Sequence, residues 1–171
     1  MNMKRRLVAV TVLLITVIGI GPVHAADPNV SFAIYLSLSD LRSEAPLSKM
    51  ELSKEPFLRD TDIIEYRWKK HEISLAPEGI KKFTRLAKRR EEGRAFVVVA
   101  DGVRCYQGAL WKSILSSIYP YPVILVDSPS RNMVRIERAY PTAAFAKGDD
   151  PRADKRIYDA LKRKNKLKET D

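Results

Sequence analysis

The stretch from Ala95 to Gly108 constrains the fold of this chain more than any other. Residues 95–100 form an unbroken apolar run, Asp101-Gly102 is a turn dipeptide, and residues 103–107 resume a β-prone pattern before Gly108 interrupts it. Aspartate followed by glycine tolerates the positive φ angles of a type I′ turn, which joins antiparallel strands tightly. A strand without polar alternation is covered on both faces. The pattern predicts a β-hairpin whose first strand lies centrally in a sheet.

The first 25 residues have the three parts of a Sec signal peptide. Residues 4–6 are basic, residues 7–20 are apolar and uncharged, and Val23-His24-Ala25 followed by Ala26 offers a small-residue cleavage site. The apolar part is shorter than the roughly 20 residues that span a bilayer, so an uncleaved anchor is the alternative. We expect a periplasmic or secreted protein that is cleaved near Ala25/Ala26.

Cleavage would leave a basic chain of ordinary domain size. Loss of the three cations at residues 4–6 lowers the formal charge from +10 to +7. A chain of about 146 residues buries enough surface for one hydrophobic core. Cys105 is the only cysteine, so no disulfide can form within the chain. We expect Cys105 to be a small buried strand residue, with a reactive or intermolecular thiol as the alternative.

Alternating apolar residues predict the other strands. Residues 30–38 read as a half-buried strand, and residues 64–75 read as a hairpin with its tip at Lys69-Lys70. A third hairpin is predicted from residues 122–126 and 133–138. Residues 39–56 are polar and rich in turn formers, so we expect a surface loop there, with room for a short strand near residues 50–52.

A helix is predicted from Pro77 to Glu92. Proline suits a first helical turn, apolar residues recur every three or four positions from Ile80 to Ala87, and Gly93 ends the pattern. Residues 109–121 mix apolar, aromatic and serine side chains, which favours a short helical turn or loop over the sheet edge. Residues 26–138 therefore predict an α+β domain, with an antiparallel-rich sheet of about six strands and one amphipathic helix on a face.

The end of the chain is predicted to be a linker, residues 139–150, and a basic helix, residues 151–171. Between Arg152 and Asp171 eight basic residues oppose four acidic ones. Such a tail suits contact with an anionic membrane surface or polymer, and a solvated helix end is the alternative. The candidate contacts are Lys162, Arg163, Lys164, Lys166 and Lys168.

Catalytic and metal motifs are weak in this sequence. There is no Gly-x-Ser-x-Gly, and His71 is the one histidine left after cleavage. A hydrolase would have to combine His71 with a serine such as Ser116 or Ser117 and an acid such as Asp101. The pair Asp60 and Asp62 lacks the further ligands of a calcium loop, so we expect turn and cap roles. No cofactor, metal or nucleic acid is predicted.

One local pattern resembles a known family. Leu75, Glu78-Gly79 and Lys82-Phe83, followed by an apolar strand that ends in Val99-Ala100-Asp101-Gly102-Val103, look like the head subdomain of the first periplasmic domain of SecD/SecDF, an accessory protein of Sec translocation. The resemblance covers about a third of the chain, from Ser74 to Val126. Residues 105–108 depart from the family, which has a Ser-Ala-Pro segment after this hairpin. The resemblance implies an α+β sandwich and a role in handling exported chains.

These features favour a binding protein over an enzyme. We expect an exported, non-enzymatic accessory module that binds a protein or peptide partner in the envelope, through its sheet edges and an aromatic segment. The candidate contacts are Trp111, Tyr119 and Tyr121. Two alternatives stay open: a protein held at an anionic envelope surface by its basic tail, and an unrecognised hydrolase that uses His71.

Overall fold

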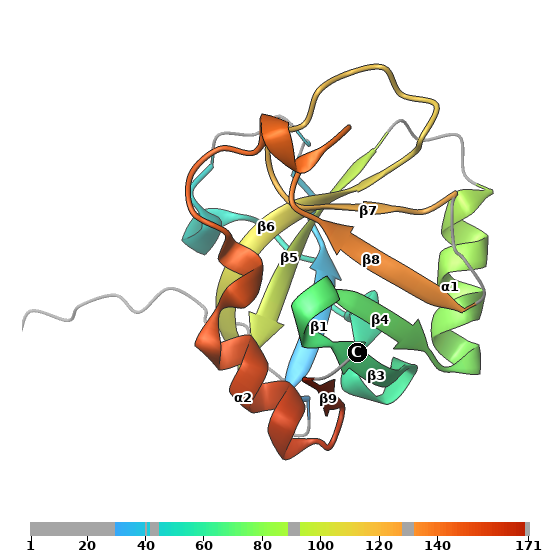
Figure 1. Cartoon of the computed structure of the whole chain (residues 1–171), viewed down its shortest axis with the longest axis vertical. Helices are drawn as coiled ribbons and strands as arrows, with labels where there is room; N and C mark the ends of the chain where they lie inside the picture. Colours follow the sequence, from blue (N-terminus) through green and yellow to red (C-terminus); the bar gives the residue numbers. More distant parts are fainter. Residues whose placement is uncertain (1–29, 40, 42–44, 89–92, 128–131, 170–171) are drawn as a thin grey trace, which may run out of the picture.

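The strands form a curled, mixed sheet. The computed structural model describes residues 30–39, 41, 45–88, 93–127 and 132–169, within which there are nine strands and two α-helices (Figure 1). The predicted signal peptide lies outside these residues. No helix in the described ranges is both long and apolar enough to cross a membrane. In pairing order the strands are β2 (Leu58–Arg59), β1 (Phe32–Leu36), β5 (Arg94–Ala100), β6 (Val103–Trp111), β7 (Val123–Leu125), β8 (Met133–Glu137), β4 (Glu72–Leu75), β3 (Ile63–Arg67) and β9 (Leu167–Lys168).

The predicted central hairpin is confirmed. Strand β5 pairs with β1 on one side and with β6 on the other, and residues 95–100 are all buried. Asp101 and Gly102 form the turn with φ angles of 47° and 76°. Positive φ at both central positions is the requirement of a type I′ turn. The local sequence therefore sets both the turn and the central place of β5.

Strand β6 continues where the sequence predicts a break. It runs through Gly108 to Trp111, so the expectation of a loop or helical turn from residue 109 is wrong at its start. A Cβ atom at Gly108 would lie 2.4 Å from the Phe96 ring and 2.5 Å from the Pro122 carbonyl oxygen. Gly108 therefore allows β5 and the chain before β7 to pack closely against β6, and it does not end the strand.

The α+β class is confirmed, but the count of about six antiparallel strands is only partly right. The hairpins β3–β4 and β7–β8 are antiparallel as predicted. Strand β6 pairs with β7 in parallel, and β9 pairs with β3 in parallel. Strands β2 and β9 have two residues each, which is too short for an alternating pattern to show in the sequence.

The ends of the sheet curl toward each other. Strands β2 and β3 stand far apart in the pairing order, yet only residues 60–62 connect them. Three residues span about 10 Å. Inside the curl, the rings of Phe32 on β1 and Tyr66 on β3 are 6.2 Å apart. The Asp62 side chain accepts the Arg59 N–H at 3.0 Å, which is the cap role that we expected. The Asp60 side chain accepts the Ser31 N–H at 3.0 Å, a contact between distant segments instead of the expected turn role.

Both helices pack into the concave side of this sheet. Helix α1 (Pro77–Ala87) ends earlier than predicted, with Lys88 at its C-cap, and residues 89–92 lie outside the described residues. Helix α2 (Lys155–Arg163) contacts β1, β5 and β9, and thus elements from both ends of the pairing order. In Figure 1 the helices flank the strands, α2 on the left and α1 on the right. Their buried residues Phe83, Leu86, Ile157, Ala160 and Leu161 join one core with the strands.

The C-terminal helix begins later than the predicted residue 151. Pro151–Ala153 is a 3₁₀ turn capped by Asp150, and α2 begins at Lys155 because the Asp154 side chain accepts the Arg156 N–H at 2.9 Å. An Asp N-cap satisfies a backbone donor at a helix start. Residues 139–150, which we expect to be a linker, include the buried Ala139 and the 3₁₀ turn Ala143–Phe145.

Candidate functional site

The three aromatic residues predicted as a partner surface form a stack from the core outward. Trp111 ends β6 and is 6% exposed, so it lies under the surface. Its ring centroid is 5.4 Å from that of half-buried Tyr119, which is 5.8 Å from that of Tyr121. Tyr121 is 42% exposed. The structure thus brings the predicted residues together, but places Trp111 deeper than expected because β6 extends past Gly108.

Hydrogen bonds fix the loop that carries this stack. Residues 112–122 run over the top of the molecule in Figure 1, between β6 and β7. Tyr119 and Tyr140 exchange backbone hydrogen bonds of 3.0 and 2.8 Å. The Asp127 carboxylate accepts the Ser113 N–H at 3.0 Å and its hydroxyl at 2.8 Å. Burial alone would raise the pKa of Asp127, but these hydrogen bonds outweigh it and lower that pKa.

Large apolar side chains stand exposed around the stack. Ile114 is 85% exposed and Ile118 is 57% exposed, both on the loop 112–122. Phe145 is 43% exposed, and the Lys147 N–H donates to the Pro120 carbonyl at 3.1 Å, which sets the segment of Phe145 beside this loop. We call Trp111, Tyr119, Tyr121, Ile114, Ile118 and Phe145 the aromatic surface. Phe145 is a new member, because it lies in a segment that the sequence favours as a linker.

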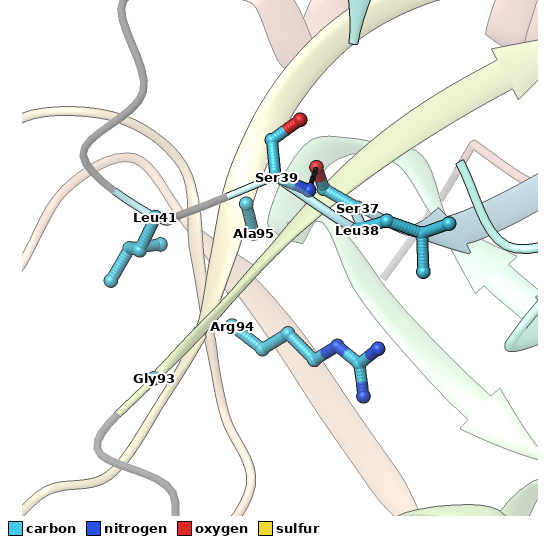
Figure 2. A pocket seen from close by; sticks show the side chains of 7 residues that line it. All are labelled: Ser37, Leu38, Ser39, Leu41, Gly93, Arg94 and Ala95. Atoms are coloured by element: carbon cyan, nitrogen blue, oxygen red, sulfur yellow. Dashed lines mark hydrogen bonds between the residues drawn. The ribbon is translucent and has the colours of Figure 1, made fainter. Parts of the chain in front are cut away.

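A pocket of about 470 Å³ lies beside the aromatic surface, where β1 ends and β5 begins (Figure 2). It is lined by Ser37, Leu38, Ser39, Leu41, Gly93, Arg94 and Ala95. Its volume is in the range of sites for small ligands or side chains. Nothing in the sequence pattern marks this pocket, because its walls come from segments more than 50 residues apart.

Leu41 and Gly93 join the pocket to the aromatic surface. Leu41 packs against the cluster under the loop that contains Trp111 and also against the cluster on the outer side of β5. A Cβ atom at Gly93 would lie 3.1 Å from both the Leu41 side chain and the Trp111 ring. The pocket and the aromatic stack are therefore neighbours across two residues, and one ligand can touch both.

The basic residues predicted to contact an anionic surface have partners within the protein. Arg163 at the end of α2 bonds Asp101 in the central hairpin turn. The apolar residues of this tail pack on the core, and its cations lie on the side that faces solvent. That these cations contact an anionic surface stays a prediction. The remaining pairs are Lys162 with Glu169 at 3.8 Å, Lys164 with Asp60 at 3.9 Å, Lys166 with the Ile63 carbonyl at 2.7 Å, and Lys168 with Glu65 at 3.9 Å.

His71 lies in a buried polar cluster. Its Nδ1 is 3.0 Å from the Tyr66 hydroxyl, and burial together with the nearby Arg152 lowers its pKa to about 4. Burial raises the pKa of the Tyr66 hydroxyl. The Asp150 carboxylate accepts two hydrogen bonds from the Arg152 guanidinium and one from the Arg152 N–H, which hold the Asp150 pKa at about 2. The imidazole is thus neutral at ordinary pH and is engaged by a tyrosine.

The partners imagined for a hydrolase do not meet at His71. Asp101 lies at the start of β6, whereas Ser116 and Ser117 lie beyond its other end. Nine strand residues span roughly 30 Å, which is far outside hydrogen-bond reach.

Metal and thiol chemistry have little support. In the part of the chain that the structure describes, no three His, Cys, Asp or Glu side chains are grouped as a metal site. Cys105 is half-buried, and burial raises the pKa of its thiol to about 11, which keeps it protonated and weakly nucleophilic.

Comparisons with known proteins give no match, so the functional argument depends on the geometry of the site. No family model, no curated protein and no solved structure matches this chain. The resemblance to the SecD head subdomain stays a prediction from the residues.

Proposed function

We propose that this chain is an exported, non-enzymatic binding protein that holds an apolar segment of a protein or peptide partner on its aromatic surface. The observation that carries the proposal is the exposure of Ile114, Ile118, Tyr121 and Phe145 on two segments that hydrogen bonds tie together. Clustered exposed apolar side chains in a soluble domain mark interaction sites. Tyrosine and tryptophan are the residues that most often dominate such sites.

The fixed geometry of the loop supports binding. Binding to a surface that is already ordered avoids the entropic cost of immobilising it. The Tyr119–Tyr140 backbone pair, the Asp127–Ser113 hydrogen bonds and the Tyr140 hydroxyl, which donates to the Ser113 carbonyl at 2.7 Å, hold this loop before any partner arrives. Tyr121 and Ile118 therefore present fixed apolar contacts.

The sheet edges were also candidates for partner contact, and we expect them to contribute less to it than the aromatic surface does. Strands β2 and β9 at the two ends of the pairing order have two residues each. Strand addition draws its affinity from a run of main-chain hydrogen bonds, and two residues offer few. The proposal therefore rests on side-chain contacts. Extended exported chains are a partner class that fits both such contacts and the role implied by the resemblance to SecD.

Site-specific photocrosslinking in the exporting cell tests the proposal. A photoreactive residue at Tyr121 should give discrete adducts, and the same probe at Thr84, exposed on α1, should not. Adding Ile118→Ser should reduce the adducts at position 121 at least about fivefold, because it removes an exposed apolar contact. Equal adducts from both positions, or none from position 121, would refute the proposed surface.

A further inference from the structure

The pocket beside the aromatic surface contains an arginine that has no partner among the described residues. Arg94, the first residue of β5, is half-buried, and its guanidinium has no ion-pair or hydrogen-bond partner among the described residues. Figure 2 shows its side chain extended across the pocket, toward the side where Leu38 lies. Leu38 is 60% exposed, so the pocket combines one available charge with an uncovered apolar wall.

Other half-buried arginines in the described chain have at least one hydrogen-bond partner, and Arg138, whose Nε is buried without one, still donates to the Gly148 carbonyl at 2.8 Å. Arg104 donates to the Leu47 and Met50 carbonyls at 2.6 and 2.9 Å, and Arg152 bonds the Asp150 carboxylate and the Ile136 carbonyl. A planar guanidinium has five donors arranged for two-point contact with a carboxylate. Among the described residues, no side chain or carbonyl accepts a hydrogen bond from the Arg94 guanidinium, whereas each of these other arginines has at least one such acceptor.

The backbone of the pocket limits which carboxylate fits. The Ser37 N–H donates to the Ala95 carbonyl at 2.8 Å, the Leu38 N–H donates to the Glu51 carbonyl at 2.8 Å, and the Ser39 N–H donates to the Ser37 hydroxyl at 3.0 Å. A terminal carboxylate is typically captured by a nest of free backbone N–H groups. These three consecutive N–H groups are all used, so the Arg94 side chain is the main donor.

We propose that the pocket receives the carboxylate of an Asp or Glu side chain in the partner segment that the aromatic surface holds. The guanidinium of Arg94 bonds that carboxylate, while Leu38, on the same side of the pocket, contacts its methylene groups. This inference rests on the proposed function, because Leu41 and Gly93 connect the pocket to Trp111. The partner is thus a peptide segment with an acidic residue next to apolar or aromatic ones.

Peptide selection tests this directly. The purified protein is used to select from a display library of random 12-residue peptides whose C-termini are fused to the carrier. Recovered peptides should be rich in apolar residues with Asp or Glu among them. A recovered peptide is then synthesised with blocked ends, as the acidic form and with Glu→Gln, and both are titrated by fluorescence anisotropy. The acidic form should bind on the order of tenfold tighter.

Matched variants assign that difference to Arg94. Arg94→Gln should make the two peptides bind equally, whereas Arg85→Gln, which removes an exposed charge on α1, should leave the difference intact. Arg94→Lys keeps the charge without the planar fork and should retain only part of the difference. Thermal unfolding of each variant confirms that it is folded.

The outcomes separate this inference from the proposed function. Apolar peptides that bind equally well with Glu or Gln would overturn the inference and leave the aromatic surface standing. Failure to select any peptide would overturn both. A preference for a free C-terminal carboxylate that depends on Arg94, measured with a library of free C-termini, would also overturn the assignment to a side-chain carboxylate.

Discussion

The aromatic surface and the basic C-terminal tail were both predicted from the sequence as contact surfaces. In the structure the first is exposed, whereas the second packs on the core. Ile114, Ile118 and Phe145 of the aromatic surface are exposed. In the tail, Ile157 and Leu161 are buried in the core and Arg163 bonds Asp101. The basic tail, whose charge suggests an exposed contact surface, packs against the rest of the protein. The aromatic surface, which carries apolar side chains, is exposed to solvent.

The difference shows what leaves a surface free to bind. Exchanging one ion-pair partner of an exposed charge for another changes the free energy little, since exposed ion pairs stabilise by only about 0–1 kcal/mol. An exposed isoleucine gains about 1.5–3 kcal/mol when it is fully buried. The aromatic surface therefore gains more from a partner than the tail does from an anionic surface.

Truncation after Tyr140 is the strongest way to break this comparison. It removes α2 and β9, and with them the core residues Ile157, Ala160 and Leu161. We expect the cooperative thermal unfolding transition, followed by circular dichroism, to be lost, because strands β1 and β5 would be uncovered on the side that α2 packs against. A truncated chain that melts cooperatively near the temperature of the full chain would show that the tail is an appendage.

Single alanine substitutions sharpen the contrast. Leu161→Ala should lower the free energy of unfolding by about 2–5 kcal/mol, because a fully buried leucine leaves a cavity. Ile114→Ala should change it by less than about 0.5 kcal/mol, as expected for an exposed position. Denaturant titration measures both. Similar losses for the two variants would mean that Ile114 is not exposed in solution.

The sequence predicts local hairpins well and the closure of the sheet poorly. The Asp101-Gly102 turn and the β3–β4 and β7–β8 hairpins depend on neighbouring residues, so their patterns are visible in the chain. Strand β9 pairs Leu167 with Tyr66, about 100 residues earlier. No alternation can be seen in a two-residue strand, and nothing local identifies a partner so distant.

The candidate site was predicted in part for the same reason. Tyr119 and Tyr121 stand out as aromatic residues among prolines, and the structure stacks them on Trp111. Phe145 joins them through the Tyr119–Tyr140 pair, which is a tertiary contact. The importance of Arg94 depends on its having no partner within the described ranges, and only the folded arrangement can show this.

Acid should loosen the start of the tail before the aromatic surface. The pKa of His71 is about 4 in the fold, below its ordinary 6.5, because of burial and Arg152. Between pH 6.5 and 4 the unfolded chain therefore binds a proton that the folded chain does not, and stability falls as the pH is lowered. We expect a loss of about 2 kcal/mol across this window. The hydrogen bonds of the Asp127 carboxylate, which fix the aromatic loop, lower its pKa and so oppose its protonation in acid.

Hydrogen exchange at pH 7 and pH 5 checks this order. Amides of residues 152–157 should lose protection at pH 5, because Arg152 lies beside His71, whereas the amides of Tyr119 and Tyr121 should change less. His71→Gln should remove most of the slope in stability between pH 6.5 and 4. A slope that persists in His71→Gln would assign the acid sensitivity to another group.

Neutralising the tail should also have a small effect, and its result decides which of the two surfaces makes the contact. Lys162→Gln with Lys164→Gln removes two exposed cations that pair with Glu169 and Asp60 at 3.8 and 3.9 Å. The free energy of unfolding should fall by less than about 1 kcal/mol. Cosedimentation with phosphatidylglycerol vesicles should change less than threefold, because the core holds the tail and internal acids partly offset its charge. Strong, salt-sensitive vesicle binding that this pair abolishes would make the tail the contact surface after all, since counterion screening acts on charges and leaves apolar contacts intact.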